Sequence, residues 1–166
     1  MEKTTQSSKA SIQIGIEEQQ RANIAQMLNL ILADEHVLYI KLRNYHWNVT
    51  GMFFQALHGL FEEQYDDIAE KIDDIAERIR SLGFFSAGSM EEFQQMTRLK
   101  ESGNQNGNAE QMIKNLLADH EAIIQILRLD INHLESDYND TGTTDFLTGL
   151  MQMHEKMAWM LRSHLA

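Results

Sequence analysis

Apolar residues recur every three or four positions over most of the chain, the spacing that is typical of amphipathic helices. The pattern predicts four long helices, over about 17–48, 53–82, 108–135 and 146–166. The apolar stripes are Ile24, Leu28, Ile31, Leu38 and Leu42 in the first helix, Met112, Leu116, Ile123, Leu127 and Leu134 in the third, and Phe146, Leu150, Met151, Met157 and Leu161 in the fourth. Because each stripe needs an apolar partner, we expect the helices to pack into one bundle.

Polar segments mark the connections between these helices. Ser89 and Glu92 have the spacing of a capping box and predict a short helix in SMEEFQQM, between the second and third long helices. Asn108 and Gln111 repeat that spacing at the start of the third helix, and the acidic segment 136–145 separates the third from the fourth. The expected fold is all-α, a four-helix bundle with a short extra helix in its long middle connection.

The chain divides into a short arm and one domain. Residues 1–16 are rich in Ser, Thr and Gln and lack an apolar period, so we expect a flexible N-terminal arm followed by a domain over 17–166. No proline interrupts the long helices. Neither a signal-peptide core nor an apolar run of about 18 residues is present, which predicts a soluble, cytoplasmic protein with no membrane partner.

Charge and the absence of cysteine narrow the chemistry. The chain has 14 Lys and Arg against 25 Asp and Glu, and its formal charge of −11 opposes binding to nucleic acid or anionic lipid. It has no cysteine, which excludes disulfides, thiolate catalysis and cysteine-bound metals. Any metal must be bound by His, Asp or Glu.

One candidate metal site begins at the end of the first helix. His58 and Glu62 are four residues apart on the second helix, so both side chains lie on one face, and His46 can join them across the helix turn. Two imidazoles and a carboxylate suit iron, zinc or manganese better than calcium or magnesium. The alternative is an ordinary solvated pair on the helix surface.

A second acidic pair follows on the same helix. Asp73 and Glu77 are also four residues apart, but Asp73 is fifteen residues from His58, about 22 Å along a helix at about 1.5 Å per residue. One chain cannot bring both sets to one metal, whereas two antiparallel copies can. The alternative is a solvent-exposed acidic face, as we expect for the neighbouring Asp66, Asp67, Glu70 and Asp74.

Three elements follow one another in HWNVTGMFFQALHGLFEEQYDDIAEKIDDIAERIRSLGF: His-Trp-Asn, His-x-x-x-Glu and Asp-x-x-Ala-Glu-Arg. In this order and spacing they resemble the signature of the Dps family, the DNA-binding proteins from starved cells, also called mini-ferritins. The likeness extends from about residue 20 to the terminal HEKMAWMLRSHL. It implies a ferritin-like bundle that assembles into a hollow dodecamer. Ferroxidase centres would lie at its two-fold interfaces, with His46, His58 and Glu62 from one subunit and Asp73 and Glu77 from its mate.

The resemblance also implies an activity. Two Fe²⁺ ions would pass their electrons together to hydrogen peroxide, and the ferric product would be stored as mineral inside the shell, protecting against oxidative damage. Zinc is an expected competitor for the site. The family more often has Asp at the position of Glu62, and Trp47 matches a tryptophan near the centre, with interface packing as its alternative role. Asp145 matches a pore carboxylate at the three-fold axis.

Three other functions have sequence requirements of their own. Ferritins and bacterioferritins use Glu-x-x-His motifs, and no Glu precedes a His by three residues here. A zinc hydrolase would need His-Glu-x-x-His, which is also absent. A DNA-compacting protein with little ferroxidase activity is the remaining alternative, but the arm offers only Lys3 and Lys9, so we expect weak or no DNA binding.

Five further histidines have less specific surroundings. His154 lies on the apolar stripe of the last helix and is expected to be a hydrogen-bonded core residue rather than a ligand. The other four are candidates for surface, interface or secondary metal sites, with no pair at a clear ligand spacing: His36, His120, His133 and His164.

Overall fold

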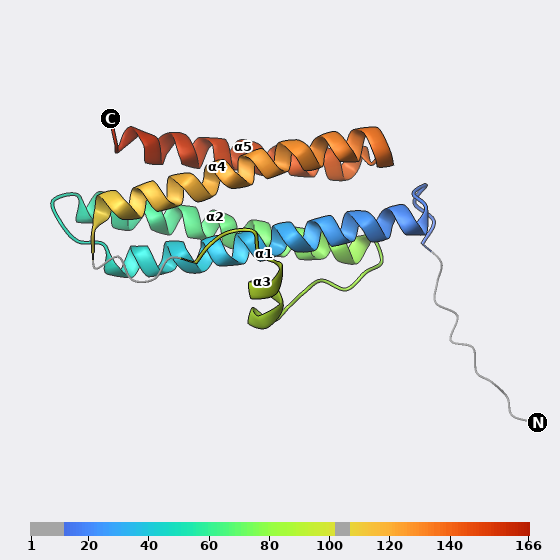
Figure 1. Ribbon diagram of the computed structural model, residues 1–166, viewed down its shortest axis with the longest axis horizontal. Coiled ribbons are helices and arrows are strands. Elements are labelled where there is room, and N and C mark those ends of the chain that lie inside the picture. The colour runs from blue at the N-terminus through green and yellow to red at the C-terminus, as the bar shows by residue number, and fades with distance from the viewer. Residues whose placement is uncertain (1–11, 102–106) are drawn as a thin grey trace, which may run out of the picture.

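The computed structural model describes residues 12–101 and 107–166, and all regular secondary structure within them is helical (Figure 1). The elements are α1 (Glu18–Asn48), α2 (Phe54–Ser81), α3 (Met90–Met96), α4 (Ala109–His133), the π-helical turn η1 (Leu134–Tyr138) and α5 (Thr141–Ser163).

The long helices form two hairpins that stack on each other. α1 packs along α2 and α4 along α5, while the connection from α2 to α4 runs the length of the bundle and carries α3 against α1 (Figure 1). Because this connection returns the chain to the end where α2 began, α4 runs in the same direction as α2. The predicted fold, a ferritin-like four-helix bundle with a short helix in its middle connection, is confirmed.

Side-chain caps mark the starts of α3, α4 and α5. Ser89 and Glu92 form the predicted capping box at α3, each side chain bonding the other's backbone N–H. The Asn108 side chain accepts a hydrogen bond from the backbone N–H of Gln111 at the start of α4, again as predicted.

The predicted start of the last helix near Phe146 is wrong. Asp140 caps the helix by accepting a hydrogen bond from the Thr143 backbone N–H, so α5 begins at Thr141, inside the acidic segment. The helix before it ends in the π-helical turn, followed by Asn139 with a left-handed φ of 51°. A polar segment between two apolar stripes therefore contains a helix start rather than a loop.

Two buried polar side chains of α1 attach the middle connection. Asp34 is 1% exposed and accepts hydrogen bonds from the Thr97 hydroxyl (2.9 Å) and the Arg98 backbone N–H (2.6 Å), and it forms an ion pair with the Arg98 side chain. Lys41 donates to the backbone oxygen of Lys100 and forms an ion pair with Asp119 of α4. The middle connection is thus bound to the bundle through two buried charged side chains of α1.

Residues 1–11 of the predicted arm lie outside the described residues. The stretch 12–16 precedes the first helix, and its last residue, Ile16, packs against the core and accepts a hydrogen bond from the Arg21 side chain. The division into a flexible arm and a domain stays a prediction. Among the described helices, none combines the length and apolar character needed to cross a bilayer.

Candidate metal centre

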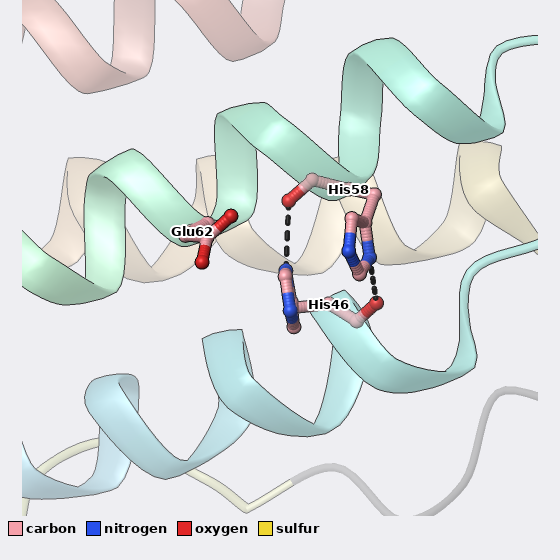
Figure 2. Close-up of side chains that lie close together, drawn as sticks. All are labelled: His46, His58 and Glu62. Atoms are coloured by element: carbon pink, nitrogen blue, oxygen red, sulfur yellow. Dashed lines mark hydrogen bonds between the residues drawn. The ribbon is translucent and has the colours of Figure 1, made fainter.

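The turn between α1 and α2 brings two histidines face to face. α1 ends at Asn48, and Gly51 adopts a φ of 111°, a conformation that favours glycine, before α2 begins at Phe54. The His46 and His58 rings consequently stack with their centroids 3.7 Å apart. Figure 2 shows the two rings between the helices, with Glu62 further along α2 on the same side.

Reciprocal hydrogen bonds fix the tautomer of both rings. The Nδ1 of His46 lies 2.8 Å from the backbone oxygen of His58, and the Nδ1 of His58 lies 2.8 Å from the backbone oxygen of His46. A carbonyl oxygen only accepts, so each Nδ1 carries the hydrogen and each Nε2 keeps a free lone pair. A backbone carbonyl behind a ring nitrogen is the usual support for a histidine that binds metal through its other nitrogen.

Glu62 completes a cluster of three ligands. One ligand atom from each of His46, His58 and Glu62 lies within 4.8 Å of the others, the first residue buried, the second half-buried and the third exposed. The predicted three residues are therefore brought together within one chain. Their donor atoms suit Fe²⁺ and Zn²⁺, and three ligands leave coordination positions open for water or an oxidant.

The structure leaves Asp73 and Glu77 apart from this cluster. Both are exposed on α2, one helix turn from each other. The step of fifteen residues from His58 to Asp73 lies within one continuous helix, so it spans about 22 Å. A centre that uses all five residues requires a second copy of the chain.

Tyr65 supports the carboxylate of the cluster. Its hydroxyl donates a hydrogen bond to Glu62 Oε1 (3.3 Å), and its ring meets the His46 ring edge-on with centroids 5.3 Å apart. Desolvation, followed by the nearby charges of Glu62 and Asp66, raises the pKa of Tyr65, so the hydroxyl keeps the proton that it donates. The sequence motifs did not single out this residue, because a tyrosine three positions after a glutamate is common on helices.

The predicted accessory residue Trp47 is 64% exposed beside the cluster, and the Arg43 guanidinium lies 5.1 Å from its ring centroid. Three more exposed apolar side chains follow in the turn and at the start of α2: Met52, Phe53 and Phe54. We call these four side chains the turn patch. Phe54 also stacks on His58, with centroids 5.1 Å apart, so the turn patch adjoins the ligands.

The acidic residues around the connection from α4 to α5 are of two kinds. Asp145 is exposed in the second turn of α5, as a pore carboxylate must be. Asp140 is 4% exposed and, besides capping α5, accepts a hydrogen bond from the Arg78 side chain (3.3 Å). The Asp140 carboxylate is therefore held by hydrogen bonds inside the fold, whereas Glu135 and Asp137 are exposed.

The remaining histidines differ in their surroundings. His154 is fully buried and hydrogen-bonded, as its place on the apolar stripe predicted. His36 is half-buried and stacks on Phe93, whereas His133 and His164 are exposed. His120 is fully buried and bonded to His154, a pairing that their separation of 34 residues did not reveal.

Known proteins resemble this chain over nearly its whole length. Residues 25–166 match the ferritin-like domain family. An uncharacterised low temperature-induced protein of Nostoc sp. (strain PCC 7120) is 46% identical over 154 residues, 93% of this chain and 86% of that protein. DNA protection during starvation protein 2 of Bacillus anthracis is 36% identical over 142 residues, 86% of this chain and 96% of that protein.

Solved structures agree with the sequence matches. A Dps protein from Vibrio cholerae O1, described as a member of a broad superfamily of ferritin-like diiron-carboxylate proteins, has a TM-score of 0.88 and 30% identity, covering 95% of this chain and 98% of its own. The fold and the sequence matches together define a ferritin-like protein. The chain belongs to the Dps family, the mini-ferritins of that class.

Proposed function

We propose that two copies of the chain pack antiparallel along α2 and share two ferroxidase centres, each formed by His46, His58 and Glu62 of one copy and Asp73 and Glu77 of the other. The observation that carries the proposal is the incomplete cluster of three ligands, with a second carboxylate pair further along the same helix. Neither set by itself offers the ligands that two iron ions need.

The spacing on α2 supports a single two-fold axis. Residues 58 and 77 are equally distant from a point between residues 67 and 68, and so are residues 62 and 73. An axis through that point places His58 opposite Glu77 and Glu62 opposite Asp73. Glu62, Asp73 and Glu77 are all exposed in the single chain, as an interface between copies requires.

The turn patch supports the same interface. Its four apolar side chains are 45% to 93% exposed and adjoin the half-site. Burying apolar surface stabilises an assembly by about 25 cal/mol per Å², whereas the ligand carboxylates alone would repel one another. Because the resemblance to the Dps family implies a hollow dodecamer, we expect twelve such copies to enclose a cavity that stores the ferric mineral.

The chemistry follows from bringing two Fe²⁺ ions together. Each ion gives one electron, and hydrogen peroxide takes both with two protons, breaking its O–O bond to form two water molecules. A transfer of two electrons avoids the one-electron step that releases hydroxyl radical. Fe²⁺ is the substrate, and Zn²⁺ is an inhibitor because it suits the same ligands but has no redox chemistry.

The proposal also covers how iron enters the assembly and where in the cell the protein acts. Asp145, exposed near the start of α5, is proposed as a pore residue that concentrates Fe²⁺ by its negative potential. A cytoplasmic location is proposed from the absence of cysteine, from the absence of a membrane-spanning helix among the described residues, and from the family.

The proposal is tested by anaerobic Fe²⁺ oxidation on adding hydrogen peroxide at half the iron concentration. We expect rapid oxidation without hydroxyl radical in the native protein and a loss of at least about tenfold in Asp73→Ala, because a missing ligand typically weakens a metal site by that factor or more. Glu70→Ala, which removes another exposed acid of α2, is the matched control. Equal rates in all three proteins would contradict a shared centre.

A further inference from the structure

A group of aromatic side chains from α1 and α2 lies beside the candidate metal ligands. Tyr39, Arg43 and Trp47 follow one another at intervals of four residues, so their side chains lie on one face of α1. Tyr65 of α2 packs against this face, with its ring edge-on to that of Tyr39 at a centroid distance of 6.0 Å. Arg43 therefore lies among three aromatic side chains.

The Arg43 guanidinium is close to all three rings. Its central carbon lies 5.5 Å from the ring centroid of Tyr39, 5.1 Å from that of Trp47 and 5.3 Å from that of Tyr65. A cation within about 6 Å of a ring centroid is attracted to the face of the ring. The Nη1 of Arg43 also donates a hydrogen bond to the Tyr39 hydroxyl (2.6 Å). One planar, permanently charged group thus bridges rings from both helices.

Tyr65 connects this group to the metal ligands. Its hydroxyl donates the hydrogen bond to Glu62, and its ring is edge-on to the His46 ring. The ring that Arg43 helps to hold therefore contacts two of the three candidate ligands.

The three ligands differ in how firmly the protein holds them. The rings of His46 and His58 are fixed by hydrogen bonds to backbone oxygens, whereas Glu62 is exposed, and Tyr65 is the hydrogen-bond partner that the structure shows for its carboxylate. A long side chain loses rotamer freedom when it binds a metal ion. A partner that already holds this carboxylate in place reduces that loss and strengthens binding.

We infer that Arg43 is a positioning residue of the metal centre, which acts by holding Tyr65 so that its hydroxyl points at Glu62. The inference rests on the proposed function, because the cluster of His46, His58 and Glu62 must bind metal. The positive charge of Arg43 does not itself favour a metal cation, since like charges repel. Its contribution is therefore geometric.

Arg43→Lys separates geometry from charge. Lysine keeps the positive charge, but its compact ammonium cannot face three rings at once as the planar guanidinium does. We expect metal binding to weaken about two- to fivefold, the effect of losing one exposed cation–π contact. Tyr65→Phe keeps the ring and removes the hydroxyl, and we expect it to weaken binding about tenfold, as the loss of a group that orients a ligand typically does.

Co²⁺ binding to the metal-free, full-length protein measures these effects without iron oxidation. Visible absorption follows the titration, and the part of the signal that disappears in His58→Ala belongs to the cluster. Arg128→Lys is the matched control, because Arg128 is an exposed arginine of α4 that pairs with Glu155. The control should bind Co²⁺ as the native protein does.

Combining the two substitutions tests whether Arg43 acts through Tyr65. In the Tyr65→Phe background, Arg43→Lys should have little further effect on Co²⁺ affinity, whereas independent effects would multiply. Both side chains are partly exposed, so we expect all of these variants to fold. Equal affinity of the native protein and Arg43→Lys would overturn the inference, and so would losses that multiply.

These results are distinguishable from a failure of the shared centre. A native protein that binds no Co²⁺ at the cluster would overturn the metal centre and the role of Arg43 together. Iron oxidation that is unaffected by Asp73→Ala would refute only the sharing between copies, and the Co²⁺ affinities would still decide the role of Arg43.

Discussion

His46 and His58 each donate an Nδ1 hydrogen to the other's backbone oxygen, at the same distance of 2.8 Å. The two hydrogen bonds connect the last turn of α1 to the first turns of α2 and leave both Nε2 atoms free. The turn therefore positions the two candidate ligands through these side-chain-to-backbone hydrogen bonds, together with the stacking of the two rings. Its geometry is independent of the partner that is proposed to complete the centre.

Co-assembly of two inactive variants tests whether the centre is shared. We expect His58→Ala and Asp73→Ala to be inactive separately, but a dimer of one copy each has one intact centre and one that lacks both residues. After unfolding and refolding as an equal mixture, about a quarter of the centres should be intact if pairing is random. The initial rate of Fe²⁺ oxidation measures this fraction.

The control for co-assembly is a mixture of the same two variants refolded separately and then combined. That mixture should stay inactive, because its copies do not exchange partners during the assay. If the co-assembled sample were as inactive as the control, a centre between subunits would be refuted.

Gly51→Ala tests the turn that positions the histidines. The φ of 111° is strained for alanine, although a Cβ at that position meets nothing within 4 Å, so the expected loss is purely conformational, about 1–2 kcal/mol in the free energy of unfolding. Urea unfolding measures it. Gly149→Ala, in the helical backbone of α5 with equally open surroundings, should instead stabilise by up to about 1 kcal/mol. Equal effects of the two changes would mean that the turn does not require glycine.

Acid should destabilise the metal-free protein through His120. Burial lowers the pKa of His120 in the folded chain, so below the ordinary value of 6.5 the unfolded chain binds a proton that the folded chain does not. Stability that is present above pH 6.5 is therefore lost as the pH falls below it. The slope that one such group adds is at most about 1.4 kcal/mol per pH unit.

Urea unfolding at several pH values between 5 and 7.5 measures that slope. We expect His120→Leu to have the shallower dependence, and His164→Leu, which removes an exposed histidine, to resemble the native protein. The same slope in all three proteins would show that His120 does not contribute.

Asp34→Ala should be among the most destabilising single changes. It removes the acceptor for the Thr97 hydroxyl and for the Arg98 backbone N–H, and the buried end of an ion pair. We expect a loss of about 2–4 kcal/mol, with easier proteolysis of the middle connection, whereas Asp34→Asn should lose less because its amide oxygen still accepts. A change of less than about 0.5 kcal/mol in Asp34→Ala would contradict this role.

The charge of the chain predicts weak or no DNA binding near neutral pH. Each copy carries a formal −11, and the arm lysines Lys3 and Lys9, which lie outside the described residues, are few against it. Gel retardation of linear duplex DNA at low salt measures binding. Saturable retardation that disappears on deleting residues 1–11 would overturn the prediction and favour the DNA-compacting alternative.

Local sequence rules predicted those features that depend on near neighbours. The capping residues Ser89 and Asn108 marked true helix starts, and the four-residue spacing of His58 and Glu62 placed two ligands on one face. The contact of His46 with them also depends on only one short turn. Each of these features is determined within a short stretch of the chain, the longest from His46 to Glu62.

Contacts between distant helices could not be predicted in this way. His120 and His154 are 34 residues apart, so their contact depends on the register between α4 and α5. Glu35 is 119 residues from His154, so their contact depends on how the two hairpins stack. The attachment of the middle connection to Asp34 could not be predicted either, because Arg98 and Asp34 are far apart in the sequence. The shared centre depends on a second copy, so neither the sequence pattern nor a single chain determines it.

All five proposed oxidation ligands belong to the first hairpin, α1 and α2, and none to α4 or α5. The proposal thus divides the chain along its length: the first half holds the proposed oxidation ligands and the proposed pairing face, and the second half closes the core around that hairpin. Substitutions in α4 and α5 are therefore expected to alter solubility or the entry of iron while the proposed oxidation ligands stay the same. For an engineer, the second hairpin is the part of this protein that is open to redesign.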